Sequence, residues 1–301
     1  MSQRTRQLKI ISYEGSSYKT DFWEGQGREF EDLTERTALR RLLPSTGGTI
    51  IEVGAGFGRL ADLYSGYDQV ILLDYSLSLL SEAKEKFGKH SNYQFVAANV
   101  YNLPFVDNAA DAIVMIRVAH HLESVEAALS EIQRVLQGGR TFILEFANKR
   151  NLKAIARYLL KRQSWSPFNR APYEFVSLNF DFHPDWMAQT LQRAGFRITD
   201  ELAISNFRLQ SVKSRISPQL LAQIDNIIAR PGAVFKLSPS ILTQNISTKQ
   251  TKTTEGLFQC PKCGDERLDT TDVALVCPTC ESHWPIIEGI IDFRYPRPEN
   301  G

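Results

Sequence analysis

Residues 49–60 read Thr-Ile-Ile-Glu-Val-Gly-Ala-Gly-Phe-Gly-Arg-Leu. The β-branched run from Ile50 to Val53 predicts a buried strand, and the three glycines after it predict a tight turn into a helix. A side chain at Gly54 or Gly56 would block that turn and hold a ligand away from the N–H groups that open the next helix. These residues are therefore a candidate ligand-binding loop, although glycines between a strand and a helix also occur in turns without a ligand.

A second buried strand, Val70-Ile-Leu-Leu-Asp74, ends in a carboxylate about 20 residues after the glycines, where doubly wound folds place the acid that holds a ribose diol. Strand-like and helical segments alternate from here to Leu242. The expected strands are residues 49–53, 70–74, 93–97, 111–116, 140–146, 197–209 and 234–242, and the expected helices are 28–43, 59–64, 77–87, 125–136, 148–162, 184–195 and 214–229. This alternation predicts an α/β fold with a doubly wound, mostly parallel seven-stranded sheet.

The glycine loop, the preceding Glu52 and the later Asp74 together resemble the Rossmann-like class of S-adenosylmethionine-dependent methyltransferases. Nicotinamide-binding proteins more usually carry Gly-x-Gly-x-x-Gly, whose third glycine would lie one position beyond Gly58. The resemblance implies S-adenosylmethionine as cofactor, with the loop facing its methionine part and Asp74 binding its ribose hydroxyls. The cofactor-binding residues that it implies are Glu52, Gly54, Ala55, Gly56, Gly58, Asp74, Tyr75, Asn99, Val100 and Arg117.

Asn99 departs from the family pattern. Members commonly have an acid before a Leu-Pro-Phe turn, and that acid or the following backbone N–H reads the adenine edge. Here Asn99 precedes Leu103-Pro-Phe105. An amide oxygen can still accept from the adenine amino group, but it carries no charge, so we expect a weaker contact.

Arg117, His120 and His121 follow the fourth expected strand, and ligands bind at the carboxyl ends of strands in open α/β sheets. His120 and His121 are the candidate catalytic bases, although a histidine pair before a helix also serves in packing or capping. Residues 117–120 replace the Asn-Pro-Pro-Tyr-like pattern with which the family methylates amide or exocyclic amino nitrogens. The resemblance therefore favours a small-molecule acceptor over adenine or glutamine.

Two segments outside the strands are candidates for ligand contact. Residues 13–43 combine an aromatic lead-in with a helix, which either packs on the sheet edge or caps the cofactor or substrate. Residues 148–162 predict a basic amphipathic helix, for which we expect a buried apolar stripe under a solvated face. The alternatives are contact with RNA or with an anionic membrane surface. The aromatic residues of 163–182 are expected to set acceptor specificity.

The four cysteines form two Cys-x-x-Cys pairs separated by 13 residues. This spacing lets four thiolates meet at one zinc ion, so Cys260, Cys263, Cys277 and Cys280 are the expected metal ligands. Residues 284–293 resemble the zinc ribbon family that includes the activator subunit of RNA and protein methyltransferases. The resemblance implies an activator or docking element acting in cis, or a site for a protein partner.

The polar composition of Thr243 to Glu255 predicts a linker, so we expect a methyltransferase domain over 1–243, a linker over 244–256 and a zinc ribbon over 257–301. The formal net charge of +1 is not the basic excess that would itself indicate nucleic-acid binding. The sequence shows neither a signal-peptide h-region nor a run of about 20 apolar residues, so we expect a cytoplasmic protein whose cysteines bind metal.

These expectations combine into one leading function. The sequence predicts an S-adenosylmethionine-dependent methyltransferase that acts on a small-molecule acceptor. Two alternatives remain: an RNA methyltransferase that contacts RNA with the ribbon and the basic helix, and a binding protein that keeps the fold without the chemistry.

Overall fold

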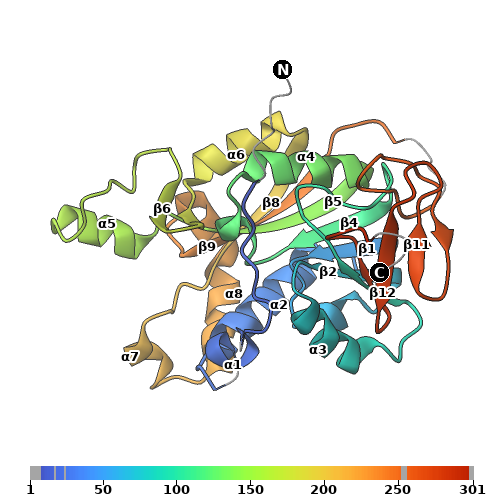
Figure 1. Ribbon diagram of the computed structural model, residues 1–301. Coiled ribbons are helices and arrows are strands. Elements are labelled where there is room, and N and C mark those ends of the chain that lie inside the picture. The colour runs from blue at the N-terminus through green and yellow to red at the C-terminus, as the bar shows by residue number, and fades with distance from the viewer. Residues whose placement is uncertain (1–7, 17, 24, 252–255, 298–301) are drawn as a thin grey trace.

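The computed structural model describes residues 8–16, 18–23, 25–251 and 256–297 (Figure 1). Its helices are α1 (Tyr18–Phe22), α2 (Glu29–Leu42), η1 (Ala61–Tyr64), α3 (Leu77–Phe87), η2 (Ala119–His121), α4 (Val125–Val135), α5 (Leu152–Leu159), α6 (Pro184–Arg193), α7 (Gln210–Lys213) and α8 (Pro218–Phe235). Its strands are β1 (Gly47–Val53), β2 (Tyr67–Asp74), β3 (Tyr93–Ala97), β4 (Ala110–Met115), β5 (Leu136–Ala147), β6 (Tyr173–Val176), β7 (Asn179–Asp181), β8 (Phe196–Ile204), β9 (Ser240–Ser247), β10 (Asp269–Thr270), β11 (Ala274–Val276), β12 (His283–Ile287) and β13 (Ile290–Asp292).

Seven strands in the order β3-β2-β1-β4-β5-β9-β8 form the central sheet. The strands from β3 to β5 in this order run parallel, and β9 lies antiparallel between β5 and β8. Helices α4 and α6 cover one face, while α2, α3 and α8 cover the other (Figure 1). Ile50 and Ile51 point to opposite faces of β1 and are both fully buried, as expected for a parallel strand between two helical layers. The prediction of a doubly wound α/β sheet is confirmed.

Local sequence signals set where several helices begin. The Ser76 hydroxyl accepts from the Leu79 N–H at the start of α3, and the Ser124 hydroxyl accepts from the Ala127 N–H at the start of α4. Pro184 and Pro218 lie in the first turns of α6 and α8, where a missing N–H costs no hydrogen bond. The expected starts of α3, α4 and α6 are therefore confirmed.

The C-terminal residues extend the same sheet. Strand β13 pairs in parallel with β3, with Ile291 opposite Val96, and adds β12, β11 and β10 beyond it. The Phe258 ring contacts Phe105 and Phe293, at centroid distances of 5.6 and 5.4 Å. Residues 256–297 therefore cover an edge of the central sheet that would otherwise expose unpaired backbone groups.

The expected linker is wrong at its start, because Thr243 to Ser247 belong to β9. Their polar side chains are satisfied inside the protein: the Asn245 side-chain amide donates to the Phe142 carbonyl at 3.0 Å and to the Thr243 hydroxyl at 2.8 Å. Composition alone could not reveal these long-range partners. Residues 252–255 of the expected linker lie outside the described residues.

Other boundaries also differ from expectation. Helix α8 continues to Phe235 through an internal Pro231, so the last strand begins at Ser240 instead of Val234. Helix α4 ends at Val135, and β5 begins directly after it at Leu136, four residues before the expected strand. Helix α5 covers only Leu152–Leu159, and Ala154 alone is buried on it, so the expected buried stripe is wrong. Within the described ranges, no helix is both long enough and apolar enough to cross a bilayer.

Candidate functional site

The glycine loop has the geometry that the sequence predicts. Gly54 and Gly56 have positive φ angles of 76° and 53°, and a Cβ atom on Gly54 would lie 2.1 Å from the Val118 side chain. The Gly54 and Ala55 N–H groups donate to the Leu73 carbonyl at the end of β2. The backbone at Gly54 therefore requires glycine for both its conformation and the space around it.

A cavity of about 110 Å³ lies at the carboxyl ends of β1, β2 and β4. Six of the residues implied for cofactor binding line it: Gly54, Gly56, Asp74, Tyr75, Val100 and Arg117. A second cavity of about 40 Å³ touches the same loop and is lined by Glu52 and Ala55 as well as by Gly54, Gly56 and Arg117. The structure thus brings most of the implied residues together around one loop.

Gly58 and Asn99 line neither cavity. Gly58 has φ of 72°, and a Cβ atom there would meet Phe87 and Ala83 of α3 at 3.1 and 3.2 Å. This glycine therefore lets the loop pack on α3. The Asn99 side-chain oxygen accepts from the Tyr101 N–H at 2.8 Å, which stabilises the turn after β3.

Asp74 lies at the wall of the larger cavity. Its carboxylate accepts from the Gly56 N–H at 2.8 Å and from the Ser76 N–H at 2.9 Å, so it also holds the glycine loop. Burial raises the pKa of Asp74 above its ordinary value, and these backbone donors oppose the shift. The remaining walls near it include Leu79, Ala98 and Val100. A carboxylate beside an apolar wall fits the ribose and adenine of S-adenosylmethionine.

The smaller cavity is bordered by charged side chains. Arg117 and Arg59 both bind the fully buried Glu35 carboxylate, at 2.5 and 2.6 Å. Both guanidinium groups also lie on the Trp23 ring, 4.9 and 4.0 Å from its centroid. Although burial acts to raise the pKa of Glu35, Arg117 and Arg59 lower it overall. Fixed cations beside the Glu52 carboxyl group fit the carboxylate and ammonium of a methionine moiety.

Arg117 belongs to both cavities and has a left-handed backbone with φ of 59°. This conformation is uncommon for a residue with a side chain, and such residues are concentrated at functional sites. The Arg117 N–H donates to the buried Glu145 carboxylate at 3.0 Å, and its side chain is held by Glu35. Arg117 is therefore fixed at both its backbone and its guanidinium group.

Burial raises the pKa of Glu52 from 4.5 to about 8. Between these two pH values the folded protein keeps a proton that the unfolded chain has lost, so the free energy of unfolding falls as pH rises. The slope expected from Glu52 is about 1 kcal/mol per pH unit. We predict that Glu52→Gln removes this slope, measured by urea unfolding across the same pH range.

The exposed Glu126 on α4 offers the matched control. Glu126→Gln should leave the slope unchanged, because this exposed side chain lies outside both cavities. If Glu52→Gln and wild type lost stability equally with rising pH, the protonated state of Glu52 would be disproved.

Of the two candidate catalytic histidines, only His121 lines the larger cavity. Its Nε2 lies 3.2 Å from the Tyr13 hydroxyl, and its Nδ1 lies 3.4 Å from the Leu178 carbonyl. Burial lowers the pKa of His121 below 6.5, so its imidazole is neutral near pH 7. The His120 ring lies partly buried beside it, with centroids 4.0 Å apart, and desolvation lowers the pKa of His120 further. The structure therefore favours His121 over His120 as a proton acceptor.

Ile10, Ile11 and Tyr13 of the N-terminal segment 8–15 contribute to the walls of the larger cavity. In Figure 1 this segment runs down the middle of the view toward α1. The Glu14 carboxylate anchors this segment by accepting from the Leu77 and Ser78 N–H groups, at 2.7 and 3.0 Å, at the start of α3. The sequence indicated only an aromatic lead-in here. Ile10 and Ile11 were missed because a short apolar pair carries no periodic signal.

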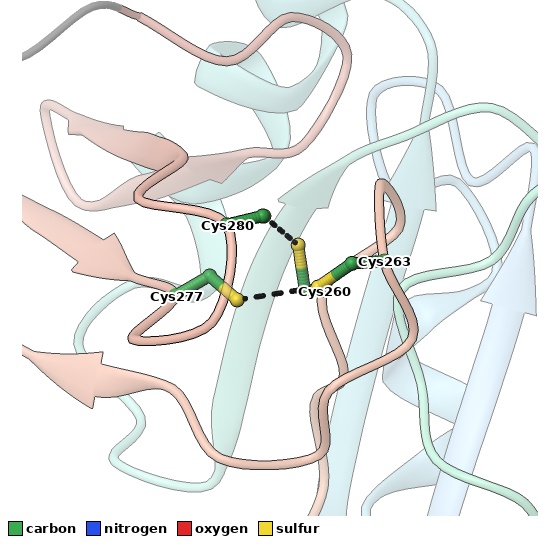
Figure 2. Close-up of side chains that lie close together, drawn as sticks. All are labelled: Cys260, Cys263, Cys277 and Cys280. Atoms are coloured by element: carbon green, nitrogen blue, oxygen red, sulfur yellow. Dashed lines mark hydrogen bonds between the residues drawn. The ribbon is translucent and has the colours of Figure 1, made fainter.

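The four cysteines meet at the tip of the C-terminal segment. Figure 2 shows Cys260 and Cys263 from one loop facing Cys277 and Cys280 from another. The Sγ atoms of Cys260 and Cys280 are 3.5 Å apart, those of Cys263 and Cys277 are 3.4 Å apart, and all four lie within 4.8 Å of one another. Sulfur ligands of a tetrahedral zinc ion, at roughly 2.3 Å from the metal, are roughly 3.8 Å apart. The cluster therefore has the donor set and spacing of a structural zinc site.

Comparisons with known proteins agree with this geometry. Residues 51–144 match the family described as a methyltransferase domain. The chain is 30% identical over 171 residues to the ubiquinone/menaquinone biosynthesis C-methyltransferase UbiE of Salmonella arizonae, and the alignment covers 51% of this chain and 68% of that relative. It is 34% identical over 119 residues to the demethylmenaquinone methyltransferase of Corynebacterium kroppenstedtii, where the alignment covers 39% of this chain. The chain spans 50% of the length of this second relative.

Solved structures share the fold. An S-adenosylmethionine-dependent methyltransferase from Listeria monocytogenes has a TM-score of 0.53 at 16% identity and covers 73% of this chain and 99% of its own. A chain from the complex of the Haloferax volcanii methyltransferase activator with a methyltransferase gives the same TM-score and identity, covering 77% of this chain and 98% of its own. The chain is an S-adenosylmethionine-dependent methyltransferase and belongs to the family that includes the UbiE C-methyltransferases.

Proposed function

We propose that this enzyme methylates a small-molecule acceptor that enters the larger cavity beside Tyr13 and His121. The observation that carries the proposal is the hydrogen-bonded Tyr13–His121 pair in the wall that also contains the glycine loop and Asp74. The mostly apolar lining of this cavity suits an acceptor with a hydrophobic ring. The two relatives are named for ubiquinone/menaquinone biosynthesis and for demethylmenaquinone, which supports a quinone-like acceptor as the first choice.

Residues of both cavities would hold S-adenosylmethionine, which supplies an electrophilic methyl group. Asp74 and Tyr75 would bind the ribose, Val100 the adenine, and the glycine loop with Glu52, Ala55 and Arg117 the methionine part. Much of the catalysis would come from positioning the acceptor and excluding water. The N-terminal segment 8–15 would contribute to that exclusion, because Ile10, Ile11 and Tyr13 form part of the cavity wall.

His121 would act as the general base. Its Nδ1 faces the Leu178 carbonyl and would carry the hydrogen, which leaves the Nε2 lone pair facing the Tyr13 hydroxyl. A proton from the acceptor could pass to Nε2 directly, or to the Tyr13 oxygen while Tyr13 gives its own proton to Nε2. Either route leaves the acceptor as the nucleophile and His121 protonated.

The C-terminal residues would form a zinc ribbon that acts in cis. We place the catalytic domain before the end of β9 at Ser247 and the ribbon at 257–301, with zinc held by the four clustered cysteines. The Haloferax volcanii structure is a complex with a methyltransferase activator, which supports such a role for an attached ribbon. In this chain Arg294 donates to the Tyr75 carbonyl at 3.0 Å, so the ribbon contacts a residue of the cofactor cavity.

Calorimetric titration with S-adenosylmethionine, followed by a methyl-transfer assay with small-molecule acceptors, tests this proposal. We expect saturable cofactor binding and transfer to a quinone-like acceptor such as demethylmenaquinone. Transfer to RNA alone, in the absence of any small-molecule acceptor, would contradict the proposal.

We predict that His121→Asn lowers kcat by roughly 10²–10⁴-fold, because the base is lost. Tyr13→Phe should lower kcat less, since direct transfer to Nε2 remains. Cofactor affinity should stay within a few fold of wild type in both variants. Because burial lowers the pKa of His121, the rate should fall only when the pH drops below 6.5.

The exposed His90, which lies outside both cavities, provides a matched control. His90→Asn should leave kcat and the pH profile unchanged. A His121→Asn enzyme with wild-type kcat would rule out His121 as the base and leave only a role in packing.

A further inference from the structure

Helix α5 and the loop after it project from the body of the protein, at the end of the sheet opposite the ribbon (Figure 1). Leu152, Leu159 and Leu160 are 63, 69 and 64% exposed, and Phe168 in the following loop is 49% exposed. A helix that supports a fold normally buries its apolar face, whereas α5 buries only Ala154. These four exposed apolar residues need an explanation beyond folding.

The same segment is strongly basic. Between Phe146 and Tyr173 the sequence contains seven cations and no carboxylate; the cations are Lys149, Arg150, Lys153, Arg157, Lys161, Arg162 and Arg170. Lys149 is buried and donates to the carbonyls of Asn169 and Ala171, so it fixes the loop. By contrast, Lys153, Arg157, Lys161 and Arg162 are exposed, and their side chains make no ion pair or hydrogen bond within the described part of the chain.

Helical spacing places Leu152, Ile155 and Leu159 on one side of α5, and Lys153 and Arg157 on the other, polar side. We call Leu152, Leu159, Leu160 and Phe168, with the cations Lys153, Arg157, Lys161 and Arg162, the α5 patch. An exposed apolar face on one side and a basic polar face on the other is the pattern of helices that lie in the interface of an anionic bilayer.

We propose that the α5 patch docks the enzyme on the surface of an anionic lipid bilayer. The leucines would enter the boundary between headgroups and acyl chains, and the four cations would contact the anionic headgroups. The helix is too short to span the bilayer and would lie along its surface. This proposal concerns a surface distinct from both cavities, and it holds whatever the methyl acceptor is.

Other occupants fit the α5 patch less well. A second copy of the chain would bring the same cations together, and like charges repel at an interface. RNA would use the cations but gains little from exposed leucines, since it is bound through phosphates and stacked bases. Trp165 and Tyr173 are the ring pair in this region best suited to base stacking, but they stack on each other with centroids 4.7 Å apart.

Cosedimentation of the full chain with lipid vesicles tests the proposal. Vesicles of phosphatidylcholine mixed with phosphatidylglycerol should bind the enzyme, and binding should weaken as salt is added. Pure phosphatidylcholine vesicles should bind it much more weakly. The double variant Leu159→Gln/Leu160→Gln should lose about tenfold in vesicle affinity. The double variant Arg157→Gln/Lys161→Gln should lose about twenty-fold at low salt.

The control is Val273→Gln, which changes an equally exposed apolar residue on the ribbon, 71% exposed. This variant should bind vesicles as wild type does. Because the changed side chains are exposed, the variants should keep the wild-type melting temperature. The proposal is overturned if the wild-type protein does not bind anionic vesicles. It is also overturned if the leucine double variant binds them with the affinity of wild type. If RNA competed with vesicle binding equally well for wild type and for the leucine double variant, the patch would be assigned to RNA.

Discussion

Asp74→Ala is expected to weaken S-adenosylmethionine binding by at least about 100-fold, because the charge-assisted hydrogen bonds that we propose between Asp74 and the ribose would be lost. The variant also removes the acceptor for the Gly56 N–H, so the glycine loop loses one of its hydrogen bonds to β2. Calorimetric titration of wild type and variant measures the difference directly.

Two further variants make the Asp74 result interpretable. Asp74→Asn keeps an oxygen acceptor without the charge, and its affinity should lie between those of wild type and Asp74→Ala. Asp68→Ala changes an exposed carboxylate on the same strand, far from its carboxyl end, and should bind as wild type does. A folded Asp74→Ala protein with wild-type affinity would contradict the ribose role of Asp74.

The glycine loop and Asp74 could be predicted because their geometry depends on neighbouring residues. Gly54 needs a positive φ and open space, and only glycine meets both requirements at low cost. The buried run before Asp74 directs its carboxylate to the carboxyl edge of the sheet. Such local constraints also made the starts of α3 and α4 predictable.

The remaining features depend on contacts between residues far apart in sequence. From the sequence alone Asn245 is assigned to a linker, because nothing near it shows that its side-chain amide donates to the Phe142 carbonyl. Tyr13 is one of several aromatic residues in its segment, and the sequence does not show that it contacts His121, which lies 108 residues later. The leucines of α5 have the spacing of a buried stripe, and nothing local shows that no other element covers them. Sequence periodicity thus identifies an apolar face but not what lies against it.

The docking of the C-terminal residues is a second long-range feature, and it links the cysteine cluster to the cofactor cavity. Strand β13 pairs with β3, whose neighbour β2 ends at Asp74. Arg294, two residues after β13, contacts the Tyr75 carbonyl and the Glu14 carboxylate. A change in the ribbon should therefore reach Tyr75 and Asp74 in the wall of the larger cavity.

Cys277→Ser is expected to abolish zinc binding and unfold the ribbon, because Cys277 is fully buried and a segment of this size depends on its metal for folding. Metal content should fall from about one zinc ion per chain to none. Loss of the ribbon would expose the edge of β3 and the aromatic contacts of Phe293. We expect rapid proteolysis after residue 256, a lower melting temperature and weaker cofactor binding.

Arg294→Ala separates loss of the ribbon from loss of its contact with the cavity. This variant keeps all four cysteines, so its zinc content should match that of wild type. Its cofactor affinity should still fall, because the hydrogen bond to the Tyr75 carbonyl is gone. Unchanged affinity in Arg294→Ala with reduced affinity in Cys277→Ser would mean that the ribbon acts only by completing the sheet. A Cys277→Ser protein with full metal content would instead disprove the four-cysteine site itself.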